Sequence, residues 1–244
     1  MQDSYQPVFA EKERVMFVFA HPDDAEIYAG GTIARLVADG KKLQLVKMTT
    51  GNKGSRQEEI KEKQLVKTRA REDTQALQVL GLDPSDSINL DLGDGQVGAS
   101  LETVEKLVAV IRKFKPEIVV THHPEKVLIR DLEGFYYVNH RDHRNTGVSV
   151  VDAAYPYSRD RLFFPEHIRG GLSSHSVTEF LFVDAWGEMD TIGIDIDKYV
   201  STRTQAIACH QSQFTQERAQ DLTDFFAAEI DGRRFEQFRY VRAD

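Results

Sequence analysis

The sequence predicts an α/β fold: a Rossmann-like, mostly parallel sheet with helices on both faces. Short apolar runs alternate with segments of helical period, and the first run, Val15–Ala20, is apolar at every position. A strand that is apolar throughout is typical of a parallel sheet buried on both faces. Alternating strands and helices imply right-handed crossovers between parallel strands. No repeat or linker divides the chain, so we expect a single domain over residues 1–244.

The first half of the chain supplies most of this alternation. Apolar side chains recur at helical spacing from Ile27 to Val37, and Gly40 is placed to end that helix. A long helical segment, Glu58–Leu80, is stopped by Gly81. Short apolar runs predict three further strands, Leu45–Met48, Ser87–Leu90 and Glu117–Thr121. A helix is predicted before the last of these strands, at Leu101–Phe114.

The second half is less regular. A long connection runs from His122 to about Asp142, and a helix is predicted at His143–Tyr155, closed by Pro156. The remaining segments predict two strands and two helices: strands Glu179–Asp184 and Thr191–Ile196, and helices Lys198–Gln211 and Glu217–Ile230. The carboxyl ends of the parallel strands should share one edge of the sheet, where ligands bind in folds of this class.

Composition narrows the class of protein. The chain of 244 residues has 31 basic and 39 acidic residues, a net charge of −8, which argues against a nucleic-acid or anionic membrane surface. No apolar run approaches the roughly 20 residues that span a bilayer, and the polar N-terminus does not resemble a signal peptide. The single cysteine, Cys209, excludes an internal disulfide and a multi-cysteine zinc cluster. We therefore expect a cytoplasmic enzyme or binding protein.

A polar motif, AHPDDAE, follows the first strand directly. His21 should lie at the ligand-binding edge, and consecutive side chains such as Asp23 and Asp24 must point in different directions. One can then ligate a metal while the other faces a water on that metal. The alternative is helix capping, with Asp23 and Glu26 as a capping box. The pair Gly30–Gly31 does not indicate a dinucleotide site, because no G-x-G-x-x-G follows the strand.

A second motif, NHRDHRNTG, follows the strand Glu117–Thr121. His140 and His143 are three residues apart, so they share one face if the segment is helical. Two histidines and an aspartate with one open position is a pattern of catalytic zinc sites. The alternative is a solvated helix start capped by Asp142. The pair His122–His123 lies near this site, but we do not assign it as ligands.

Together the two motifs, AHPDDAE…GGT and HRDHRNTG, resemble the PIG-L/LmbE-like family of zinc-dependent de-N-acetylases. That family includes enzymes acting on N-acetylglucosaminyl-phosphatidylinositol and on thiol-sugar precursors. The resemblance implies a hydrolase that removes an N-acetyl group from an amino sugar or its conjugate. It implies one Zn²⁺ per chain held by His21, Asp24 and His143, with Asp23 as the general base for a zinc-activated water. Other divalent transition metals suit the same ligands.

Further roles are carried over by the same resemblance. His140 would stabilise the tetrahedral intermediate or protonate the leaving amine, and Asp142 would orient a histidine. Arg69 matches an arginine that holds substrate; its alternative is a surface ion pair on its own helix, with the acidic residues three and four positions on. His210 and Gln213, in the segment CHQSQF, are carried over as substrate-binding residues.

Two alternative functions remain open at this stage. One is a zinc-dependent amidase that cleaves a larger acyl group or a thiol-sugar conjugate. The other is a non-catalytic zinc or sugar binder, against which the second carboxylate argues. The segment 125–138 looks longer than is usual in the family, so the substrate cannot be transferred from it. The resemblance and the aromatic run Phe135–Tyr137 also suggest a homo-oligomer.

Overall fold

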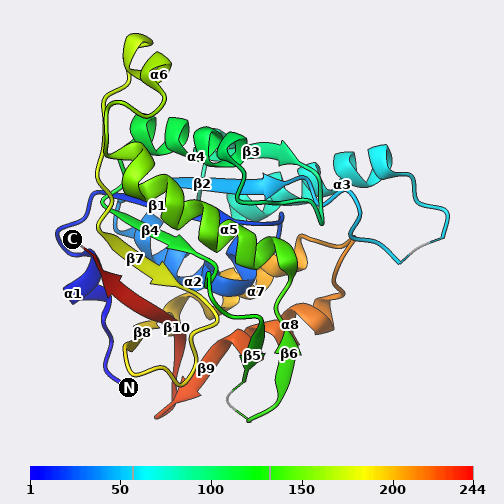
Figure 1. The fold of residues 1–244 in the computed structure, drawn as a ribbon. Coiled ribbons are helices and arrows are strands. Elements are labelled where there is room, and N and C mark those ends of the chain that lie inside the picture. The colour runs from blue at the N-terminus through cyan, green and yellow to red at the C-terminus, as the bar shows by residue number, and fades with distance from the viewer. Residues whose placement is uncertain (57, 132, 244) are drawn as a thin grey trace.

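The computed structural model describes residues 1–56, 58–131 and 133–243. Its centre is a sheet in the order β3-β2-β1-β4-β7-β10-β8, with β9 paired to β10 (Figure 1). The first five strands in this order run parallel, and β10 is antiparallel to its neighbours. The strands are β1 Arg14–Phe19, β2 Lys42–Thr49, β3 Ser87–Leu92, β4 Ile118–Thr121, β7 Glu179–Phe182, β8 Thr191–Asp195, β9 Ala227–Ile230 and β10 Arg233–Arg242.

Helices cover both faces of the sheet, as predicted, and β1 shows why. Val15, Phe17 and Phe19 belong to one buried cluster with side chains of α2 and α3, whereas Met16 and Val18 belong to another with α4 and α5. A strand whose alternate residues enter two cores must be apolar throughout. The helices are α1 Tyr5–Phe9, α2 Asp24–Ala38, α3 Glu62–Val79, α4 Leu101–Phe114, α5 Arg141–Asp152, α6 Pro165–Arg169, α7 Val200–Ala208 and α8 Gln216–Phe226.

The structure differs from the predicted elements mainly after residue 122. The predicted connection contains a hairpin of β5 Leu128–Arg130 and β6 Tyr136–Val138. The predicted helix Glu217–Ile230 ends at Phe226, because the last four residues pair with β10 as β9. Tertiary pairing here overrides local helix propensity.

Other boundaries shift by a few residues. Pro156 does not close the helix, since a helical turn continues through Ala153–Ser158 with Tyr155 in an extended conformation. β10 was not predicted, and its sequence RRFEQFRYVR lacks an apolar run. No helix in the described ranges has the length and apolar character needed to cross a membrane.

The pair Gly30–Gly31 has a packing role in α2. A Cβ at Gly31 would lie 2.6 Å from Ile196, and one at Gly30 would lie 3.1 Å from the Arg203 side chain. The Gly31 N–H also donates to Glu236 of β10, which pairs with Arg203 at 2.9 Å. The glycines therefore let α2 lie directly against α7 and the sheet, which fixes the helix whose first residues form the candidate site.

Candidate active site

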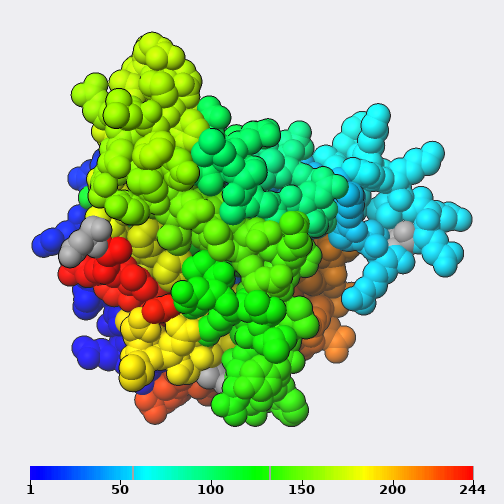
Figure 2. All heavy atoms as spheres, viewed as in Figure 1, coloured from blue at the N-terminus to red at the C-terminus, as the bar shows by residue number. Residues whose placement is uncertain are grey.

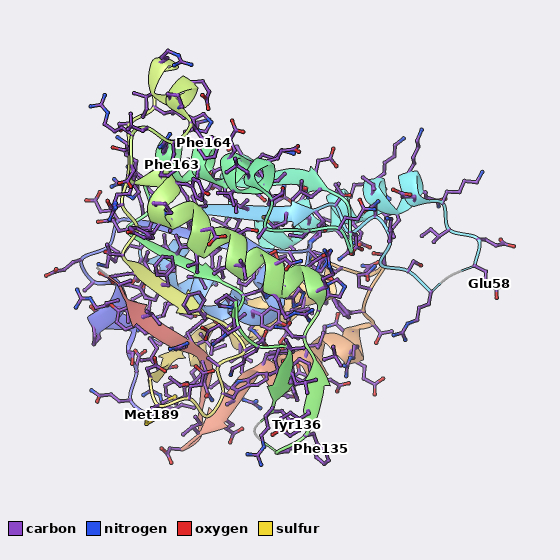
Figure 3. The ribbon with its side chains drawn as sticks, viewed as in Figure 1. Glu58, Phe135, Tyr136, Phe163, Phe164 and Met189 are labelled. Atoms are coloured by element: carbon purple, nitrogen blue, oxygen red, sulfur yellow. The ribbon has the colours of Figure 1, made fainter. Side chains whose placement is uncertain are left out.

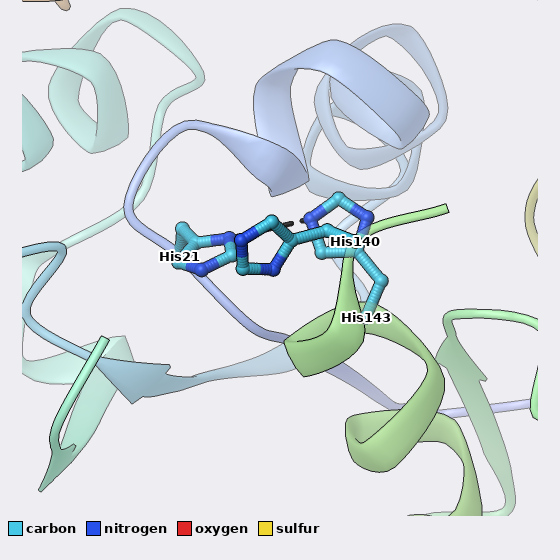
Figure 4. Close-up of side chains that lie close together, drawn as sticks. All are labelled: His21, His140 and His143. Atoms are coloured by element: carbon cyan, nitrogen blue, oxygen red, sulfur yellow. Dashed lines mark hydrogen bonds between the residues drawn. The ribbon is translucent and has the colours of Figure 1, made fainter. Parts of the chain in front are cut away.

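Three elements, β1, β4 and α5, bring motif side chains to one edge of the sheet. β1 and β4 pair in parallel, so their carboxyl ends meet there, and His21 and His122 follow them. α5 lies close to the end of β4, because a Cβ at Gly147 would overlap the carbonyl oxygen of His122. The start of α5 thereby places the rings of His140 and His143 at 4.8 and 5.2 Å from that of His21, between centroids (Figure 4).

Three side chains present atoms at the spacing of a tetrahedral metal site. His21 Nδ1 lies 3.2 Å from His143 Nε2. The Asp24 carboxylate places Oδ2 3.3 Å from His21 Nδ1 and Oδ1 3.3 Å from His143 Nε2. In a tetrahedral zinc site with bonds of about 2.05 Å, neighbouring ligand atoms are about 3.3 Å apart. Two imidazoles and one carboxylate are also a donor set that zinc accepts. The residues predicted as ligands therefore fit the metal in both chemistry and spacing.

The surroundings keep Asp24 ionised. Burial alone would raise the pKa of its carboxyl group, but His143, His122 and His21 hold that pKa well below its usual value. The Asp24 carboxylate also accepts the backbone N–H of His21 at 2.8 Å. An ionised, fixed carboxylate is the form that ligates a metal.

His122 is fully buried beside this cluster, yet its contacts suit a supporting position. Burial and the neighbouring His143 lower its pKa to about 3, so the ring is neutral. Its Nε2 accepts the N–H of Ala20 at 3.3 Å, and its ring stacks on that of His143 with centroids 3.9 Å apart. Because the lone pair of Nε2 faces a backbone donor, the ring is better placed to support His143 by stacking than to bind a metal.

Asp23 occupies the N-cap position of α2 without capping it. Its side chain makes no capping hydrogen bond, and its φ of 122° is one that non-glycine residues rarely adopt. The carboxylate instead accepts Arg69 Nη2 at 2.9 Å. The capping alternative therefore does not describe this residue, and backbone strain of this kind is concentrated at functional sites.

Arg69 reaches Asp23 through the interior rather than along the surface of α3. Its side chain is 3% exposed and also donates to the carbonyl oxygens of Pro22 and Gly51, at 2.5 and 3.2 Å. The two acidic residues considered as its surface partners bond elsewhere, Glu72 to Ser212 and Asp73 to Lys47. Arg69 thus places a positive charge in direct contact with the Asp23 carboxylate.

The start of α5 fixes two more predicted residues. His140, and not Asp142, caps the helix, because its Nδ1 accepts the N–H of Asp142 at 3.1 Å. Burial and the histidines nearby lower the pKa of His140, so its ring is neutral with the proton on Nε2. Asp142 is fully buried, accepts the N–H groups of Gly95 and Val97, and lies 3.4 Å from His21 Nε2. The histidine it can orient is therefore His21.

The family can be assigned from a family model described as PIG-L, GlcNAc-PI de-N-acetylase. This model matches residues 16–154, which is more than half of the chain and includes both motifs. The chain belongs to the PIG-L family.

Relatives of this PIG-L chain include deacetylases of amino sugars. It is 27% identical to the diacetylchitobiose deacetylase of Thermococcus kodakarensis over 86% of its own length and 73% of that protein. It is 26% identical to the 1D-myo-inositol 2-acetamido-2-deoxy-alpha-D-glucopyranoside deacetylase of Rhodococcus erythropolis, over 84% of its own length and 83% of that protein. The structure of N,N'-diacetylchitobiose deacetylase from Pyrococcus horikoshii superposes with a TM-score of 0.83 and 25% identity, covering 98% of this chain and 87% of that one.

The PIG-L site includes one carboxylate that sequence reasoning did not select. Asp94, in the turn after β3, lies 3.3 Å from His21 Nε2 and shares that ring atom with Asp142. Together these carboxylates and Asp24 raise the pKa of His21 well above its usual value, although burial acts in the opposite direction. The only signal in the sequence was the position of Asp94 just beyond a predicted strand.

An open cavity of about 350 Å³ contains the site. Its lining includes the predicted residues Arg69 and Gln213, together with the carboxylates and histidines His21, Asp23, Asp24, Asp94, His140 and His143. His210 is not in this lining: it is fully buried, with Nε2 3.5 Å from Glu26. The apolar part of the lining consists of Ile27, Tyr28, Phe214, Leu222 and Phe226.

Proposed function

We propose that this protein is a metal-dependent N-deacetylase that removes the acetyl group from an N-acetylated amino sugar or its conjugate. The observation that carries the proposal is the mutual spacing of 3.2–3.3 Å among His21, Asp24 and His143, in a cavity that also contains Asp23. The relatives that act on N-acetylated sugars support the same reaction class.

We assign His21, Asp24 and His143 as ligands of one divalent metal, zinc in the first instance. Bound there, zinc supplies a Lewis acid that acidifies water and polarises the acetamide carbonyl. Asp142 and Asp94 hold His21 from its other nitrogen, at 3.4 and 3.3 Å. Such outer contacts fix the orientation of a ligating imidazole.

Asp23 is assigned as the general base. Burial raises the pKa of its carboxyl group, with Arg69 opposing that rise, so the group is both basic and anchored. Arg69 engages Oδ2, which leaves Oδ1 to take the proton of the attacking water. Arg69 therefore acts through Asp23 in this proposal, as a positioning residue, although its side chain also lines the cavity.

His140 is assigned to the oxyanion and the leaving amine. Its Nδ1 accepts a backbone N–H, so the proton of the neutral ring is on Nε2 and can be donated. A donor aimed at the oxygen that becomes negative stabilises the tetrahedral intermediate. Protonation of the departing nitrogen, by His140 or by Asp23 carrying the proton it took, then completes the reaction.

One feature favours hydrolysis over simple binding. A simple binder would not need Asp23, a strained residue without a capping bond, held by a buried arginine.

The test is a screen of N-acetylated amino sugars for released acid, with added zinc and after removal of metal by a chelator. We expect acetate, dependent on the metal. A larger acid from an N-acyl analogue, without acetate, would indicate the amidase alternative, and no acid from any compound would contradict the proposal. Elemental analysis accompanies the screen. His143→Ala should lose the bound metal, whereas the control His175→Ala, whose ring binds the carbonyl of Pro116, should retain it.

A further inference from the structure

Asp184 is a buried carboxylate that the proposed mechanism does not use. It follows β7, whose carboxyl end lies beside that of β4, and the Val183 N–H donates to the Thr121 carbonyl oxygen there at 3.0 Å. His21, His122 and Asp184 thus follow three neighbouring parallel strands, β1, β4 and β7. Asp184 therefore lies at the same edge of the sheet as the metal site.

The environment of Asp184 is unusual for a carboxylate. The residue is 2% exposed, and its φ of 59° is in the left-handed region that non-glycine residues rarely adopt. Oδ1 accepts the hydroxyl of Tyr137 at 2.8 Å, whereas Oδ2 is buried without a hydrogen-bond partner in the described part of the chain. Lys126 binds the backbone carbonyl oxygen of Asp184 at 2.8 Å, but its ammonium pairs with Glu188. Among the described residues, no lysine or arginine nitrogen lies within 4.0 Å of the Asp184 carboxylate.

The positive charge nearest in effect to Asp184 belongs to the metal site. Burial raises the pKa of its carboxyl group to about 6, and His143 is the strongest influence in the opposite direction. The ring of His143 stacks on that of His122, and Tyr28 packs edge-on against both rings. In the described ranges, Asp24 is the one carboxylate within 4.0 Å of a His143 nitrogen. Asp184 therefore acts on this ligand through space and not through a hydrogen bond.

The two histidine ligands differ in how carboxylates support them. His21 has Asp94 and Asp142 at its second nitrogen, at 3.3 and 3.4 Å. We propose that Asp184 is a positioning residue on the other side of the site: its negative charge, held in place by Tyr137, stabilises a divalent cation bound by His143. A fixed carboxylate in a buried, poorly screened position attracts a cation without touching it. This inference rests on the metal ligands assigned under the proposed function.

The same contacts give the hairpin β5–β6 a role at the metal site. Tyr137 is the central residue of β6, and its ring also contacts Trp186, with centroids 6.4 Å apart. Its neighbour Tyr136 is exposed on the outer side of the hairpin (Figure 3). Figure 2 shows the hairpin, in green, against the segment that follows β7, in yellow. The hairpin thus carries the hydroxyl group that fixes the carboxylate of Asp184.

The test is the affinity for zinc, measured at neutral pH by competition with a chromophoric chelator. Asp184→Asn removes the charge and keeps the shape, and Asn tolerates the left-handed backbone. We expect the dissociation constant for zinc to rise about tenfold, the lower end of the range for residues that support a metal site. The control Asp190→Asn makes the same charge change at an exposed carboxylate paired with Arg239, and it should leave the constant within about twofold of the parent.

Thermal melting separates this role from a structural one. Because Asp184 is a buried charge with one unpartnered oxygen, Asp184→Asn should leave the Tm of the metal-free protein unchanged or raise it. The rise in Tm on adding zinc should be smaller than in the parent protein, since the variant binds zinc more weakly. A merely structural residue would give the opposite pattern, with a lower Tm in the absence of metal and an unchanged zinc affinity, and that result would overturn the inference.

Tyr137→Phe keeps the carboxylate and removes its anchor, so the zinc affinity should fall by less than in Asp184→Asn. An equal fall in the two variants would mean that docking of the hairpin, and not the charge, supports the metal, which also overturns the inference. If Asp184→Asn does not fold, Asp184→Gly suits the φ of 59° and should show the same weakening of zinc binding. A parent protein that binds no zinc would instead contradict the proposed function, which the other outcomes leave intact.

Discussion

The substitution Asp23→Asn separates catalysis from structure at the candidate site. If Asp23 takes the proton, its loss should lower kcat by about 10²- to 10⁴-fold. The metal should remain bound, because the three assigned ligands are unchanged. Asn tolerates a positive φ better than most residues, so the backbone at φ 122° should persist. No cap is lost either, since Asp23 makes no capping hydrogen bond.

The stability cost of this substitution follows from the contact with Arg69. The bond of 2.9 Å between Arg69 Nη2 and the carboxylate becomes a bond to a neutral amide oxygen. Hydrogen bonds to charged groups contribute about 1.5–3 kcal/mol and neutral ones about 0.5–1.5 kcal/mol, so unfolding should become easier by about 1–2 kcal/mol. In a chain of this size, that corresponds to a fall in Tm of about 2–8 °C.

Acetate release, elemental analysis and calorimetry measure the three quantities. The matched control is Asp73→Asn, which weakens the ion pair between Lys47 and Asp73, 2.6 Å apart and outside the cavity lining. It should cost comparable stability while kcat stays within about twofold of the parent protein, an estimate for a carboxylate with no proton-transfer role. A turnover of Asp23→Asn within tenfold of the parent, with metal bound, would refute the assignment of the base and make His140 the next candidate.

Three further expectations concern packing and assembly. Gly147→Ala should lower the free energy of unfolding by about 1–3 kcal/mol and reduce acetate release, because its Cβ meets the carbonyl of His122; unchanged denaturant curves would contradict this. Glu236→Gln should cost about 3–5 kcal/mol by leaving the buried charge of Arg203 unpaired, and thermal melting within about 2 °C of the parent would contradict it. We also predict a homo-oligomer, with the exposed side chains of Phe135 and Tyr136 as candidate contacts (Figure 3); a monomer by light scattering at micromolar concentration would refute it.

The inner parallel strands β1 and β4 could be predicted because each has a simple local pattern. Strands that are buried on both faces are apolar at nearly every position, and the helices between them have a clear period. β10 carries no such pattern: Glu236 and Gln237 are buried within it, and Glu236 finds its partners, Gly31, Thr32 and Arg203, only in the folded chain. β9 is a strand because β10 lies beside it, so its four residues give no local signal.

The site residues divide in the same way. Some stand in short sequence motifs, and others reach the site only through the fold. His21, Asp23, Asp24, His140 and His143 stand in two compact motifs, and the structure brings all five into one cavity. The contacts of Asp94 and His122 with these residues depend on which strands are neighbours in the sheet, which no short motif encodes. The burial of His210, which the resemblance placed near substrate, depends equally on the packing of α7 and α8 against α2.

Arg69 illustrates how the structure changes the role expected of a residue. The resemblance indicated a substrate contact. In the structure the side chain is 3% exposed, and its N–H groups donate hydrogen bonds to Asp23, Pro22 and Gly51. A Cβ at Gly51, whose φ is 63°, would overlap the guanidinium, so this loop is shaped around the arginine. Asp23 in turn breaks two local rules, with a positive φ and a capping position that it does not use. Local rules that fail together around one carboxylate are expected where the fold holds a group for chemistry, because stability alone would favour an ordinary cap.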